Sequence, residues 1–235
     1  MALGSEHTLK AFDEDIDRLR GLISEMGGRA EAAITESITA LTRKDLGLAA
    51  HVVANDHKID ELEAEIEKLV VQTIALRAPM ADDLREVVAA LKIVGVIERI
   101  GDYAKNIAKR VPLIAESSSI KPSTLLPAMA QVAGEMVHDV LNAFAARDAS
   151  LAEAVCGRDK VVDDFYNSIF RTLVTYMMEN PRHITQSAHL LFIAKNIERI
   201  GDHATNIAEM VYFAATGQHL PERERGEHPT EPHEE

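Results

Sequence analysis

The sequence predicts an all-α protein built from two tandem three-helix bundles that are related by internal pseudo-symmetry. The first observation is a repeat, because the segment 97–108, IERIGDYAKNIA, returns at 197–208 as IERIGDHATNIA, with ten of twelve positions identical. A spacing of 100 residues is typical of a duplicated small domain rather than of a solenoid unit. The second observation is composition: aromatic residues make up only 4% of the chain and Trp is absent, which favours helix over strand.

Three long helices are expected in the first half, because apolar residues recur there at steps of three and four. The first helix runs from about residue 12 to 41 and contains Gly27-Gly28, for which the close approach of another helix is the expected reason. The second begins after Asp45, a favourable N-cap residue, and ends before Pro79, which lacks an amide donor. The third helix runs from about residue 81 to 115 and carries the first copy of the repeated motif.

The second half repeats this order after a Ser-rich linker, ESSSIKP. Its helices are expected at about 123–147, 148–178 and 184–215, with Gly217 as the last C-cap. The final segment is charged, contains proline and has almost no large apolar residue, so it is expected to be disordered. The predicted units are a first bundle at 10–116, a second bundle at 122–216 and a tail at 217–235.

Charge and cysteine content limit the possible partners and the compartment. A formal net charge of −13 argues against binding to nucleic acid or to anionic lipid headgroups. The single cysteine, Cys156, excludes an intramolecular disulfide and suits a reducing compartment. The sequence contains neither a signal peptide nor the roughly 20 apolar residues that a membrane span requires. A soluble, cytoplasmic protein is therefore expected.

Acidic residues four apart mark the candidate functional sites, because such residues lie on one face of a helix. Glu98 and Asp102 form one pair on the third helix, and Asp56 and Asp60 form another on the second. Chain segments of equal length lead from Pro79 to Asp60 and to Glu98, so antiparallel helices would bring the two pairs together at one seam. The corresponding acids of the second half are Asp159, Asp163, Glu198 and Asp202.

Carboxylates that converge in this way repel one another unless a cation lies between them. An all-oxygen site suits hard cations such as Mg²⁺, Mn²⁺, Ca²⁺ or ferric iron rather than a structural Zn²⁺. Glu36 and Asp139 correspond between the halves and are candidates to complete such sites from the first helix of each. The alternatives are a solvated acidic face, or neutralisation by Arg99 and Arg199, but recurrence in both halves favours a metal.

No catalytic residues are identified. Glu135-x-x-His138 is one ExxH motif, whereas di-iron bundles of the ferritin type use two. The equivalent positions in the first half are Ala32 and Thr35, so such a site would be incomplete. No Gly-rich phosphate loop and no nucleophile elbow is present. A non-enzymatic protein is expected, and the alternatives are a carboxylate-bridged di-metal oxidoreductase and a metal-free helical scaffold.

The repeated motif and the residues around it resemble the PhoU family over about residues 10–216. The resemblance rests on the doubled ERIGDxxxNI, the DxxxD of the preceding helix, Met26-Gly27-Gly28 and the segment 173–179, LVTYMME. It implies the fold described above, with metal ions (iron, manganese, magnesium or zinc) on the acidic motifs. The residues implied as ligands are Asp56, Asp60, Glu98, Asp102, Asp159, Asp163, Glu198 and Asp202.

The same resemblance implies a function and partners. Members of this family act as negative regulators of the phosphate-starvation response. They connect the ATPase subunit of a high-affinity phosphate ABC transporter to its phosphate-sensing histidine kinase. The chain is accordingly expected to associate with the membrane only through these partners. Its exposed helical faces indicate a homodimer.

Overall fold

The computed structural model describes residues 2–115 and 124–220, with side chains from Lys10 onward. Every element in this part of the chain is helical. The elements are α1 (Ala2–Arg43), α2 (Leu46–Asn55), α3 (His57–Arg77), α4 (Asp82–Ala108), α5 (Val111–Ala115), α6 (Leu125–Ala146), α7 (Ala149–Cys156), α8 (Asp159–Glu179), the 3₁₀ turn η2 (Pro181–His183) and α9 (Ile184–Thr216). The predicted linker, and residues 221–235 of the predicted tail, lie outside the described residues.

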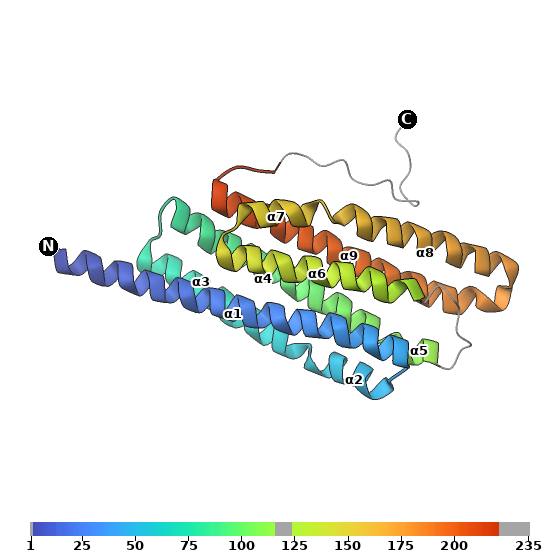
Figure 1. Cartoon of the computed structure of the whole chain (residues 1–235). Coiled ribbons are helices and arrows are strands. Elements are labelled where there is room, and N and C mark those ends of the chain that lie inside the picture. The colour runs from blue at the N-terminus through green and yellow to red at the C-terminus, as the bar shows by residue number, and fades with distance from the viewer. Residues whose placement is uncertain (1, 116–123, 221–235) are drawn as a thin grey trace.

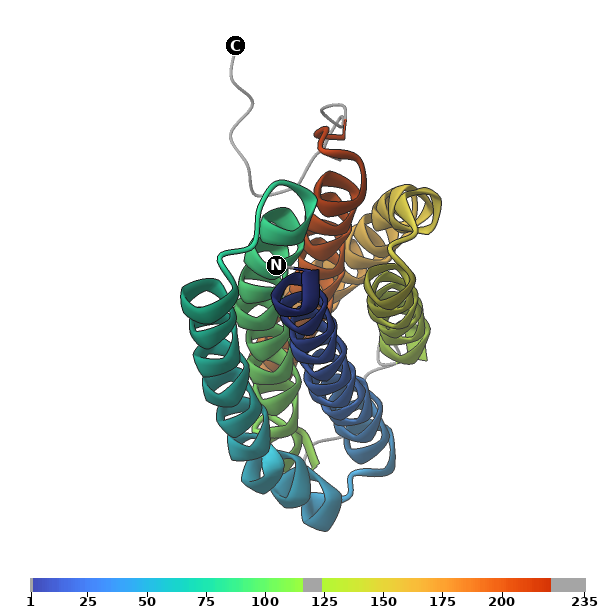
Figure 2. The same ribbon diagram turned by 90° about the vertical axis from the view of Figure 1, so that its left-hand side faces the viewer.

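The helices form two three-helix units that lie side by side along their lengths (Figures 1 and 2). In the first unit α1 packs against α3 and α4, and in the second α6 packs against α8 and α9. The helices α4 and α9, which carry the two copies of the motif, run in opposite directions (Figure 1). Tyr103 and His203, which are equivalent positions in the two copies, make an edge-on ring contact with centroids 5.2 Å apart. This contact is what an approximate twofold axis between the two helices would produce.

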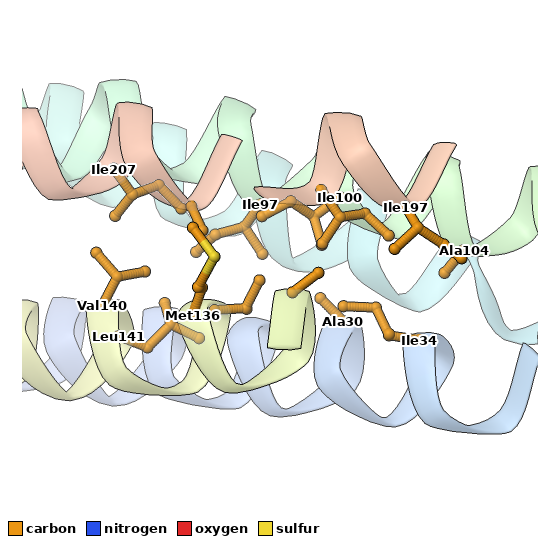
Figure 3. Packing of buried hydrophobic residues seen from close by; sticks show 14 of the residues in the cluster. Ala30, Ile34, Ile97, Ile100, Ala104, Met136, Val140, Leu141, Ile197 and Ile207 are labelled. Carbon is orange, nitrogen blue, oxygen red and sulfur yellow. The ribbon is translucent and has the colours of Figure 1, made fainter. Parts of the chain in front are cut away.

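The two units share one hydrophobic core, because α4 packs against α9 and α1 packs against α6. The motif isoleucines Ile97, Ile197 and Ile207 are fully buried there. Figure 3 shows Ile207 opposite Val140 of α6, whereas Ile197 lies opposite Ile34 of α1. Burial of this apolar surface is the main force that holds the helices together. The four helices α1, α4, α6 and α9 therefore form the centre of the molecule, with α3 and α8 outside them.

Local signals that the sequence provides set several helix ends. The Asp45 side chain accepts a hydrogen bond from the Leu48 amide at 2.9 Å, and Asp148 caps α7 in the same way at 3.0 Å. Helix α3 ends at Arg77, just before Pro79, and Gly217 caps α9 with φ of 73°. The predicted N-caps, proline stop and glycine C-cap are confirmed.

The second expected helix of each half is divided in two, which the periodicity did not predict. The Ile59 amide bonds to the Asp56 carbonyl at 2.8 Å, and the Val161 amide bonds to the Arg158 carbonyl at 3.0 Å. Such three-residue steps tighten the chain into a 3₁₀-type turn. Each turn lies at the first acid of a DxxxD motif, so Asp56 directly precedes α3 and Asp159 is the first residue of α8. In addition, α1 begins at Ala2, well before the expected start near residue 12.

Glycines mark close helix contacts at only some of the predicted positions. A Cβ atom on Gly27 would collide with Leu141 of α6, so the expected close approach is confirmed there. The neighbouring Gly28 has nothing within 4 Å of that position, and the same expectation is wrong for it. In the motif itself, a Cβ on Gly101 would lie 2.7 Å from Cδ1 of Ile59. Gly101 thus lets α4 approach α3 closely where the acidic pairs lie.

Candidate metal centre

The first acidic seam lies between α3 and α4, which run antiparallel from the loop at Pro79. Asp56 and Asp60 come from the start of α3, and Glu98 and Asp102 come from the second half of α4. Because Gly95 and Gly101 have no side chain, the backbone of α4 lies close to Glu63 and Asp56, with carboxylate oxygens 3.7 and 3.8 Å from where a Cβ would be. The predicted meeting of the two pairs at one seam is therefore found in the structure.

The acids of this seam influence one another electrostatically. The pKa of Glu98 is raised, first by partial burial and then by the negative charges of Asp102, Glu63 and Asp60. The pKa of Glu63 is raised for the same two reasons, burial and neighbouring carboxylates. Both shifts have the sign expected when like charges are held close together. Glu63, one turn beyond Asp60, therefore belongs to the first seam.

Two basic side chains reduce this repulsion. The Lys105 ammonium makes ion pairs with Asp56 and with Asp102, so it joins the start of α3 to α4. Burial alone would lower the pKa of Lys105, but the hydrogen bonds that it donates to the two carboxylates outweigh burial and raise the pKa. Arg99 lies 3.9 Å from Glu98 and is largely exposed. Of the two, Lys105 rather than Arg99, the alternative counter-ion considered from the sequence, makes the close ion pairs of this seam.

The second seam, between α8 and α9, is more deeply buried. Its Glu198 side chain is 1% exposed, against 23% for Glu98 in the first seam. Asp163 is also buried. Lys195 binds Glu198 at 2.6 Å, and its ammonium lies 5.3 Å from the ring centroid of Tyr166. The two halves therefore carry corresponding motif acids in the sequence, but their seams differ in burial and in the lysine that pairs with a motif acid.

The donor set of the first seam fits a hard cation, because it consists of carboxylates whose negative charges repel one another. In the first half the residues that would hold a cation are Asp56, Asp60, Glu98 and Asp102, and in the second Asp159, Asp163, Glu198 and Asp202. In the described part of the chain, no group of three or more His, Cys, Asp or Glu side chains is arranged to hold a metal ion. Ligation would therefore require these side chains to change their present contacts.

The other candidate residues lie apart from the seams. The His138 ring contacts Glu31 at 3.1 Å in an open groove of about 610 Å³ between α1 and α6. Arg158 binds Glu135 and Asp139, each at 2.6 Å, so Asp139 is already held by a cation. By contrast Glu36 lines a smaller hollow of about 240 Å³ together with Asp56, as expected for a residue that extends the first seam.

Sequence reasoning missed the two lysines of the seams. Lys105 follows Asp102 by three residues and Lys195 precedes Glu198 by three, so both lie on the acidic face of their helices. This three-residue spacing could have predicted the ion pairs Asp102–Lys105 and Lys195–Glu198, each within one helix. The bridge from Lys105 to Asp56 joins residues 49 apart, and no pattern within one helix predicts it.

Comparison with known proteins agrees with the doubled architecture. The PhoU domain matches twice, at residues 23–111 and 126–211, which together cover most of the chain. The chain belongs to the PhoU family. PhoU proteins are accessory and regulatory proteins rather than enzymes, which confirms the expectation of a non-enzymatic protein.

Relatives of known name cover nearly the whole chain. A "phosphate-specific transport system accessory protein PhoU homolog" of Zymomonas mobilis is 57% identical over 220 residues, 94% of this chain and 93% of its own. A protein of the same name from Caulobacter vibrioides is 47% identical over 92% of this chain and 94% of its own. The crystal structure of PhoU from Pseudomonas aeruginosa superposes with a TM-score of 0.85 at 37% identity, covering 88% of this chain and all of that one. The PhoU fold, with two domains of three long helices, is thus established.

In the described residues no helix is both long and apolar enough to cross a membrane.

Proposed function

We propose that this PhoU protein is a negative regulator of the phosphate-starvation response. It would link the ATPase subunit of a high-affinity phosphate ABC transporter to the cytoplasmic part of a phosphate-sensing histidine kinase. The observation that carries the proposal is 57% identity, over almost the full length of both chains, to a protein named as an accessory of phosphate-specific transport. A solved relative from Streptococcus pneumoniae is described as the regulatory protein of the phosphate transport system. Both partners expose cytoplasmic surfaces, so the proposed location is the cytoplasm.

The surface of the chain supports an adaptor role. Large apolar side chains are exposed around the loop between α3 and α4 and around the end of α8, where Met80 is 79% and Met178 is 81% exposed. Exposed apolar side chains that gather in this way are typical of protein–protein contacts. They offer surfaces for the proposed partners and for a homodimer. Analytical ultracentrifugation of the purified protein tests the dimer, and a single species at monomer mass would exclude it.

A deletion strain tests the regulatory role directly. Removal of the gene should leave a phosphate-starvation promoter active in phosphate-rich medium, and a second deletion of the kinase gene should silence it. Complementation with the intact gene should restore repression. A deletion strain that represses the promoter normally in rich medium would contradict the proposal.

We further propose that the two acidic seams bind metal ions as part of this protein's function. Elemental analysis and titration with Mg²⁺, Mn²⁺ and iron would compare the natural protein with the Glu98→Ala/Asp102→Ala variant. Loss of part of the bound metal in the variant is the expected result. Metal uptake that is unchanged would contradict the assignment of the first seam. The ion pairs of Lys105 favour the alternative of a metal-free scaffold, which predicts no stoichiometric metal in either protein.

A further inference from the structure

The first seam already contains a cation of the protein's own. The Nζ atom of Lys105 contacts Oδ2 of Asp56 and Oδ1 of Asp102, one carboxylate from each side of the seam. The Lys105 side chain is 21% exposed and that of Asp56 is 11% exposed, so the contact is shielded from most of the solvent. Screening by water and salt is weak for a pair of this kind. Lys105 therefore closes this end of the seam in the metal-free state.

A metal ion on the first seam would need the same two carboxylates. Lys105 now binds one oxygen of each, Oδ2 of Asp56 and Oδ1 of Asp102. An ammonium and a divalent cation repel each other strongly at the distance at which both would touch one carboxylate. The metal can therefore bind both acids only after Lys105 has moved away.

We infer that Lys105 is a displaceable counter-ion of the first seam. It holds α3 to α4 when no metal is bound, and it lowers the affinity of the seam for divalent cations. This inference rests on the proposed metal binding at the seams. It also explains why the carboxylates of the described residues are not arranged around a metal position. The ion pairs of Lys105 stabilise the seam in this other arrangement.

The second copy of the motif differs at this position. The residue equivalent to Lys105 is Thr205, which is buried and donates its hydroxyl to the Gly201 carbonyl of its own helix at 3.1 Å. The repeat has therefore kept the acids while the residue three positions after the last acid has changed in size and in charge. Such a change tunes the affinity of one seam without altering its proposed ligands.

Substitution of Lys105 by Met removes the charge and keeps most of the side-chain volume. Lys109→Met is the matched control, since it removes the same charge one turn further along, where Lys109 is exposed. Both changes are made in the natural protein and in an Asp159→Asn/Asp163→Asn background, in which the first seam is measured alone. Mn²⁺ is the probe, and the electron paramagnetic resonance signal of the free aqua ion gives the bound fraction.

The expected result is that Lys105→Met binds Mn²⁺ at least about tenfold more tightly than Lys109→Met, a change of about 1.4 kcal/mol. In EDTA the order of thermal stability should be the reverse, because Lys105→Met leaves two carboxylates without their cation and melts at a lower temperature than Lys109→Met. Lys105→Gln, which retains hydrogen-bonding capacity, serves if the Met variant does not fold.

Two results would overturn the inference, and they can be told apart. Equal Mn²⁺ affinity of Lys105→Met and Lys109→Met would overturn the role of Lys105 while leaving metal binding at the seam intact. Absence of Mn²⁺ binding above the level of Glu98→Ala/Asp102→Ala in every variant would overturn the metal proposal, and this inference with it.

Discussion

Gly101 lies in the repeated motif and fixes how closely the two helices of the first seam approach. A Cβ atom at this position would lie 2.7 Å from Cδ1 of Ile59, and Ile59 is itself only 3% exposed. The side chain of Ile59 therefore has little room to move away. Gly28 of α1 is the matched control, because it is also inside a helix but has nothing within 4 Å of a Cβ. Substitution of each glycine by Ala separates helix propensity from helix contact.

The magnitudes follow from two opposing effects. Ala is more favourable than Gly inside a helix by about 1 kcal/mol, whatever its surroundings. Forcing an additional methyl group into a packed contact costs about 1–3 kcal/mol. Gly28→Ala should therefore stabilise the protein by about 1 kcal/mol. Gly101→Ala should lie ~1–3 kcal/mol below Gly28→Ala in its free energy of unfolding, since only this variant has the clash.

Equilibrium unfolding in urea, followed by circular dichroism in EDTA, measures both variants without interference from bound metal. Each 1 kcal/mol should correspond to roughly 2–4 °C in Tm for a chain of this size. Gly201→Ala, whose Cβ would lie 3.3 Å from Val162, is expected between the other two. Equal stabilisation by Gly101→Ala and Gly28→Ala would refute the reasoning that Gly101 is required for the close approach of α3 and α4.

Three further predictions concern residues outside the proposed ligands. Burial and the charges of Arg99 and Arg199 lower the pKa of His203, so the folded protein should lose stability as pH falls below about 6.5. His203→Gln should make the melting temperature depend less on pH between pH 5 and 8. An unchanged pH profile would contradict this role of His203. Glu86 is buried and paired with Arg20 and Arg147. Glu86→Ala should therefore lower the free energy of unfolding in urea by ~1–3 kcal/mol, and a decrease below the error of the measurement would refute this. Asp45→Ala should lower the free energy of unfolding by about 1 kcal/mol through loss of the α2 cap, whereas Asp45→Asn, a cap of similar strength, should be nearly neutral.

The sequence predicted the helices and the acids of the seams because these depend on local properties. Apolar spacing marked the buried faces, and Asp45, Asp148, Pro79 and Gly217 marked helix ends through hydrogen bonds or steric limits that act within a few residues. The turns at Asp56 and at Arg158 were missed, because the apolar spacing continues across them although Asn55, Asp56 and Gly157 are weak helix formers. Contacts with other helices decide such breaks, and single-helix periodicity carries no information about them.

The sequence by itself determined that this protein is a duplicated helical bundle of the PhoU family, with matched acidic pairs on matched helix faces. Those features follow from a 3.6-residue period and from a near-identical repeat. Tertiary structure alone decided that the two units share one core, that Glu198 is far more buried than Glu98, and that Lys105 bridges Asp56 and Asp102. Burial and long-range ion pairs depend on which helices become neighbours, so identical motifs acquire different surroundings in the two halves.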